Sequence, residues 1–199
     1  MNILLDQMPE YLNVCGEKHK IRTDFRTWMQ FENELYWSDS DLQERIITCL
    51  LLCFIDGIPV NVNEAVRAAV EFYQCNGSEK NETSHARAER EGKQAAWQNR
   101  AYSFRYDAGL IYAAFQAQYG IDLQTSDMHW WRFNALFSGL TESNKICKIM
   151  EYRVADLASI KDKEQKAFYR KMKQIYRLPD PRSEEEKEAA MLDALSAMF

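Results

Sequence analysis

His129 and Cys147 are the residues in the most aromatic stretch of the chain whose side chains could take part in a reaction. A histidine beside a cysteine can act as a general base that activates the thiol. His129 directly precedes Trp130 and Trp131, however, where a partly exposed position in the first turn of a helix accounts for it. The other histidines are His19 and His85, and no two of the three have the spacing of a helical metal-ligand pair.

Cys49 and Cys53 are one helical turn apart, so their thiols would share one helix face and could form half of a metal site. No histidine or second cysteine pair lies nearby at ligand spacing, and the neighbours are Leu50–Leu52 and Phe54. We therefore predict that both thiols are buried as small hydrophobic groups and bind no metal. The five cysteines include no CxxC pair, which favours a reducing compartment.

Asp107, Asp122 and Asp127 cluster where helices are predicted to begin. Helix capping accounts for acidic residues at such positions. The chain has no GxSxG motif and no glycine-rich phosphate loop after a strand. The sequence therefore predicts a protein that is not an enzyme and has neither a cofactor nor a metal site.

The residues from 104 to 153 predict three amphipathic helices. The first follows Ser103 and ends at Gly120, the second runs from Ser126 to about Ser138, and the third opens at Thr141. The aromatic residues share the apolar faces of these helices with Ile, Leu and Met and are not interleaved with Lys and Arg. We therefore interpret them as a hydrophobic core, against the alternative of a base-stacking surface.

The first 75 residues predict a β-hairpin followed by three helices. The expected elements are strands at 11–14 and 18–21 and helices at 25–37, 42–55 and 64–75. The expected caps are Thr23 or Asp24 for the first helix, Ser40 for the second and Asn63 for the third.

The chain changes character after Cys75, where residues rich in Gly, Asn, Ser, Lys and Glu predict an exposed linker. The predicted fold class is mainly α, a helical bundle with a short N-terminal β-hairpin, in two helical halves joined by this polar linker. The predicted units are a hairpin with three helices at 1–75, the linker at 76–101, a second helical unit at 102–178 and a terminal helix at 179–199.

A helix is predicted from Ser159 or Asp162 to Tyr176, and its two faces differ. One face is apolar through Phe168, Met172, Ile175 and Tyr176. The other carries a basic stripe at steps of three and four, formed by Lys163, Lys166, Arg170, Lys173 and Arg177. Contact with nucleic-acid phosphates, docking to an acidic partner surface and a solvated face are all compatible with this pattern.

The end of the chain predicts an amphipathic helix behind a stiff break. Pro179 and Pro181 prevent the preceding helix from continuing, and Ser183 with Glu186 forms a capping box. One face of the new helix carries a terminal stripe, formed by Met191, Leu192, Leu195, Met198 and Phe199. Such a stripe can close over its own domain or enter a groove of a partner protein.

The composition argues against two classes of partner. A net charge of -5 over 199 residues disfavours general nucleic-acid binding. The first residues lack the pattern of a signal peptide, and the strongest apolar run, Ile46 to Ile55, is about half the length that a bilayer requires. We therefore expect no contact with a membrane.

Five segments of the chain carry a resemblance to a family of phage proteins. They are MNILLDQMPEYLNV, KIRTDFRTWMQFENEL, YDAGLIYAAFQAQYGIDL, MHWWRFNALFSGL and KDKEQKAFYRKMKQIY. With them the chain resembles the small proteins encoded in the tail-assembly module of long-tailed phages and prophages of Gram-positive bacteria, near the tape measure gene. The match covers most of the chain except about 76–100 and the residues after Arg182.

The resemblance implies a role in tail morphogenesis, as a tail assembly chaperone that coats the tape measure protein until tail-tube subunits displace it. It implies location in the host bacterial cytoplasm, possible homo-oligomers, and absence of the protein from the mature virion. Two other functions stay open: a structural tail or connector subunit that is kept in the virion, and a nucleic-acid-binding regulator that uses the basic stripe.

Overall fold

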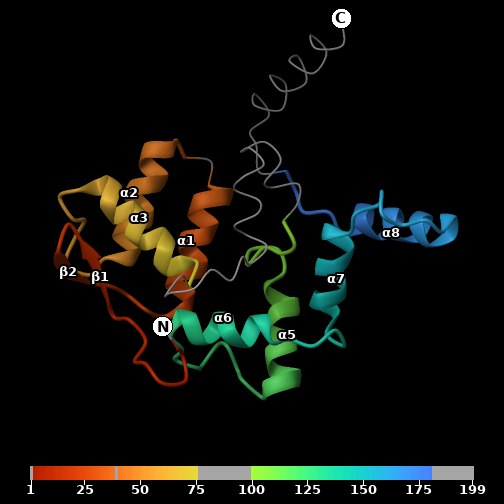
Figure 1. Cartoon of the computed structure of the whole chain (residues 1–199), viewed down its shortest axis with the longest axis horizontal. Coiled ribbons are helices and arrows are strands. Elements are labelled where there is room, and N and C mark those ends of the chain that lie inside the picture. The colour runs from red at the N-terminus through yellow and green to blue at the C-terminus, as the bar shows by residue number, and fades with distance from the viewer. Residues whose placement is uncertain (1, 39, 76–99, 181–199) are drawn as a thin grey trace, which may run out of the picture.

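The computed structural model describes residues 2–38, 40–75 and 100–180, and this part of the chain is mainly helical (Figure 1). A short β-hairpin precedes the helices, which confirms the predicted fold class. The elements are, in order, β1 (Tyr11–Val14), β2 (Glu17–Lys20), α1 (Phe25–Trp37), α2 (Leu42–Cys53), α3 (Val62–Tyr73), α5 (Ala108–Tyr119), α6 (Trp130–Ser138), α7 (Lys145–Val154) and α8 (Lys163–Ile175). None of the described helices is long and apolar enough to cross a bilayer.

The hairpin is tighter than the sequence predicts, because β2 already begins at Glu17 and pairs there with Val14. The two turn residues, Cys15 and Gly16, have φ values of 53° and 89°, and positive φ at both positions matches the twist of a two-residue hairpin. After the hairpin, Ile21 forms a β-bridge with Phe54. This bridge ends α2 at Cys53, two residues before the predicted end.

Two predicted helix caps are wrong in the first half of the chain. The side chain of Asp41, not Ser40, caps α2 by accepting the backbone N–H groups of Gln43 and Glu44 at 2.8 and 3.0 Å. The side chain of Asn61, not Asn63, caps α3. Of the two caps predicted for α1, Thr23 and Asp24, the structure has Asp24.

The three helices of the central stretch also begin later than predicted. Asp107, His129 and Asn144 occupy the cap positions in place of Ser103, Ser126 and Thr141. Local turns use the intervening residues: the N–H of Asp107 donates to the carbonyl of Ser103 at 2.9 Å, and that of Asn144 to the carbonyl of Thr141 at 3.0 Å. The bond from Asp107 to Ser103 is one that a helix capped by Ser103 would also make, but the regular helical hydrogen bonds begin only at Asp107, whose carbonyl accepts the N–H of Ile111.

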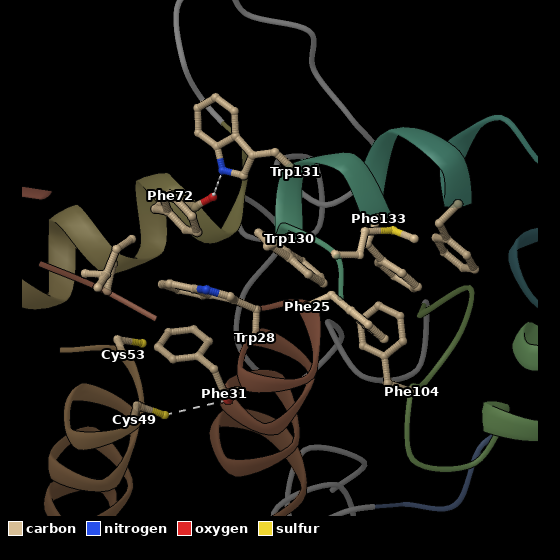
Figure 2. Packing of buried hydrophobic residues seen from close by; sticks show 14 of the residues in the cluster. Phe25, Trp28, Phe31, Cys49, Cys53, Phe72, Phe104, Trp130, Trp131 and Phe133 are labelled. Atoms are coloured by element: carbon tan, nitrogen blue, oxygen red, sulfur yellow. Dashed lines mark hydrogen bonds between the residues drawn. The ribbon is translucent and has the colours of Figure 1, made fainter. Parts of the chain in front are cut away.

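An aromatic cluster joins the two predicted helical units (Figure 2). Trp28 on α1 packs against Phe72 on α3 with ring centroids 4.5 Å apart. Phe133 on α6 stacks on Phe25 at 5.0 Å and on Phe115 of α5 at 4.9 Å. These side chains are fully or almost fully buried, so the predicted role of the aromatic residues as core is confirmed. The boundaries of the two units stay a prediction, and most of the predicted linker lies outside the described residues.

Candidate protein-binding surface

His129 is held as a helix cap in a way that occupies both of its ring nitrogens. Its Nδ1 accepts the N–H of Trp131 at 3.1 Å, and its Nε2 lies 3.1 Å from the carbonyl oxygen of Pro9. The neutral ring therefore carries its hydrogen on Nε2 and donates it to Pro9. Burial lowers the pKa of His129, and its hydrogen bond to Pro9 and the charge of Glu10 oppose that effect.

The lowered pKa of His129 predicts a pH dependence of stability. The unfolded histidine binds a proton below about pH 6.5, while the folded one binds it only at lower pH. Stability from this group is therefore complete above about pH 6.5 and is lost as the pH falls toward the folded pKa. Between pH 7.5 and 5.5, urea unfolding should show a larger loss for the native chain than for His129→Asn, which keeps a capping acceptor that does not titrate. Equal losses of stability in the two proteins would contradict a lowered pKa for His129 in the folded chain.

The thiols of Cys49 and Cys53 are buried beside Phe31, as predicted (Figure 2). The Cys49 thiol donates to the carbonyl oxygen of Phe31 at 3.6 Å. Burial raises the pKa of Cys49 to about 12 and raises that of Cys53 further, so neither provides a thiolate at neutral pH. Across the described ranges, no three His, Cys, Asp or Glu side chains are arranged to hold a metal ion.

Glu32 is fully buried and forms a polar cluster that the residue pattern alone did not predict. Its carboxylate pairs with Arg100 at 2.7 Å and accepts a hydrogen bond from the hydroxyl of Tyr73. The Arg100 guanidinium also covers the ring of Tyr36, 4.0 Å from its centroid. Burial raises the pKa of Glu32, and the charge of Arg100 works against that rise. The cluster joins α1, α3 and the chain before α5, and it leaves no acidic group facing solvent.

Asp107 forms a buried ion pair with Arg153 of α7. The pair is bidentate, with N–O distances of 2.5 and 2.9 Å. Arg153 also donates to the carbonyl oxygens of Tyr176 at 2.6 Å and Ala101 at 3.1 Å. Asp107 was predicted to cap a helix, but its side chain makes no capping bond within α5. Its actual role is to fix Arg153, which in turn holds the chain at the end of α8.

The helix α8 lies at one end of the molecule, away from α1–α3, and packs on α7 (Figure 1). None of its residues is buried. Its contact with α7 is aromatic: Tyr152 meets Phe168 and Tyr169 edge to face at 5.9 and 5.7 Å and stacks on Tyr176 at 6.0 Å. One side of α8 is thus held on α7, and the described part of the chain leaves every residue of α8 at least partly exposed.

An apolar edge of α8 stays exposed beside this contact. Phe168 and Ile175 are 48% and 57% exposed, and Lys171, also exposed, lies between them on the same side of the helix. We call these three residues the α8 edge. Aromatic side chains such as that of Phe168 are enriched in protein contact surfaces, whereas lysine is depleted there. The sequence predicted this apolar face but not that it is left uncovered by the described residues.

The basic stripe lies on the other side of α8, and some of its side chains are partly buried or hydrogen-bonded within the chain. Lys163, Arg170 and Arg177 are exposed, while Lys166 and Lys173 are half-buried. The ammonium of Lys173 donates to the carbonyl oxygen of Ala155 at 3.1 Å. The predicted contacts of the terminal stripe lie outside the described residues.

Two other surfaces qualify as apolar contact sites. Ile47 and Leu51 are 49% and 54% exposed and lie one turn apart on α2. A groove of about 540 Å³ between α1 and α5 is lined mainly by apolar side chains, together with Arg26, Tyr112 and Gln124. The Arg26 guanidinium already donates to the carbonyl oxygens of Leu123, Gln124 and Ser126. The guanidinium of Arg26 in this groove is therefore already hydrogen-bonded within the chain.

Comparison with known proteins gives one family and no individual relative. A family model described as bacteriophage Gp15 protein matches residues 4–178. No curated protein and no solved structure matches the chain. The matched range contains every described helix and strand, including α8 and the chain that Arg153 holds behind it. Because the match covers most of its length, the chain belongs to the bacteriophage Gp15 protein family.

Proposed function

We propose that this phage protein is a tail assembly chaperone that binds the tape measure protein through protein–protein contacts. The observation that carries the proposal is the α8 edge, an apolar surface on a helix with no buried residue. A tape measure protein is a long helical ruler, and amphipathic helices are bound by apolar surfaces of this kind. The resemblance to proteins of tail-assembly modules in phages of Gram-positive bacteria supports this partner.

We also propose that the protein acts only by binding its partner and catalyses no reaction. His129 is engaged with backbone groups, and burial keeps the Cys49 and Cys53 thiols protonated at neutral pH. A chaperone acts in the host bacterial cytoplasm, needs no cofactor and leaves the tail when tube subunits take its place.

Affinity capture from phage-producing cells tests the proposal, with the full-length protein as bait. We expect the native chain to recover the tape measure protein, and Ile175→Asp to recover at least about tenfold less, as for a residue at the centre of a contact. Leu51→Asp is the matched control, because it places the same charge on a similarly exposed apolar position of α2. Equal recovery by all three, or none by the native chain, would contradict the proposal.

The second exposed apolar site, at Ile47 and Leu51, favours one alternative function. A subunit built into a tail or connector is contacted on more than one side, and these residues lie on a different element from the α8 edge. Mass spectrometry of purified virions separates the two functions. A structural subunit is present in stoichiometric amounts, while a chaperone is absent or scarce.

A further inference from the structure

The described residues leave one face of α2 uncovered, on the opposite side of the molecule from α8 (Figure 1). Glu44, Ile47 and Leu51 follow one another at steps of three and four, so their side chains share one side of the helix. All three are exposed, while the buried residues of α2 turn toward α1 and α3. We call Glu44, Ile47 and Leu51 the α2 face.

We propose that the α2 face binds the α2 face of a second copy of this chain, with the two helices antiparallel. A two-fold interface uses the same surface on both copies, so that surface must be complementary to itself. The α2 face meets this condition through its apolar pair and through the charges at the two ends of the helix. This inference goes beyond the proposed function and does not depend on the tape measure protein.

Opposite charges lie at the two ends of α2. The carboxylate of Glu44 is in the first turn of the helix and is exposed. At the other end, Nη1 of the exposed Arg22 donates to three carbonyl oxygens at 3.0 Å each, those of Leu51, Leu52 and Phe54. Within the described part of the chain, neither Glu44 nor Arg22 belongs to an ion pair. Both charges are therefore available to a partner with the opposite charge at the matching position.

The apolar contact fixes a register that brings these charges together. Residue numbers rise along one helix of an antiparallel pair as they fall along the other, so Ile47 can lie opposite Leu51 of the second copy, and Leu51 opposite its Ile47. Glu44 then lies opposite Phe54 of the second copy, at the turn to which Arg22 is bonded. The two-fold axis repeats this contact at the other end. A parallel pair would place like charges side by side, which is unfavourable in an interface.

The size of this contact predicts a weak dimer. The helix α2 has 12 residues and is about 18 Å long, so one helix pair buries less than the roughly 1,200–2,000 Å² of a stable interface. We therefore expect a Kd on the order of 10–100 μM. Such a dimer would cover Ile47 and Leu51 without any tail subunit, which would remove the observation that favours a structural role.

Sedimentation equilibrium of the purified full-length protein in reducing buffer, over about 5–500 μM, tests the dimer. We expect the native chain to dimerise, and Leu51→Asp to raise the Kd at least about tenfold, because a two-fold contact loses each residue twice. Glu44→Lys would put a lysine against Arg22 and should raise the Kd at least about fivefold at low salt. The effect of Glu44→Lys should shrink at about 1 M salt, where the screening length is about 3 Å.

Two controls make the same kinds of change on α8. Ile175→Asp and Glu164→Lys, the latter also at an exposed acid in the first turn of a helix, should dimerise with the native Kd. A native chain that stays monomeric up to about 500 μM would overturn the inference. An unchanged Kd in Leu51→Asp would assign the dimer to another surface, and equal Kd values for Glu44→Lys and Glu164→Lys would contradict the antiparallel register.

Discussion

Asp107→Ala is expected to lower the free energy of unfolding by about 3–5 kcal/mol. The substitution leaves the guanidinium of Arg153 buried without its bidentate carboxylate, since the side chains of this pair are only 4% and 8% exposed. A buried charge without a partner is far more costly than the loss of a surface ion pair. Urea unfolding followed by circular dichroism measures the change.

Two further variants serve as controls for Asp107→Ala. Glu64→Ala removes a carboxylate from the exposed pair with Arg67 and should change stability little. Asp107→Ala combined with Arg153→Met should recover part of the loss, because the uncompensated charge is gone. A loss for Asp107→Ala no larger than that for Glu64→Ala would show that the ion pair does not hold α7 and the end of α8.

Phe133→Ala is expected to have a comparable effect, about 3–5 kcal/mol, through the aromatic core. Phe133 is fully buried and stacks on Phe25 and Phe115 with centroid distances of 5.0 and 4.9 Å. Truncation to alanine removes the ring at the point where α1, α5 and α6 meet and leaves a cavity among close-packed side chains.

Phe168→Ala is the matched control for the core prediction, because it removes the same ring from a half-exposed position. Its effect on the free energy of unfolding should be less than half of that of Phe133→Ala. Equal effects of the two substitutions would mean that Phe133 does not belong to the core of the cooperative unit that unfolds.

The helices and their apolar faces follow from the sequence because they depend on local spacing. The bounds of α1, Phe25–Trp37, agree with the prediction, and so does the burial of Cys49 and Cys53. Helix starts were less predictable, since Ser103, Ser126 and Thr141 are all good capping residues. The later start of α6 depends on the bridge between Asp24 and His129, which forms only when distant segments meet, whereas the turns before α5 and α7 are local.

The buried ion pairs were missed although the sequence contains a signal for them. Glu32 follows Trp28 by four residues, and Arg153 follows Ile149 by four, so each lies on the apolar face of its helix. A charge in such a position predicts a buried partner, but spacing alone does not identify Arg100 or Asp107. The exposure of the α8 edge was unpredictable for a similar reason, because spacing shows that a face is apolar and not what covers it.

Titration of the purified full-length protein with a purified tape measure fragment tests the central claim, that this protein works by contact through the α8 edge. We expect saturable binding by the native chain and by Leu51→Asp, and a Kd at least about tenfold higher for Ile175→Asp, a difference of about 1.4 kcal/mol in binding free energy. Binding with the same Kd in all three proteins, or no binding by the native chain to any part of the tape measure protein, would contradict it.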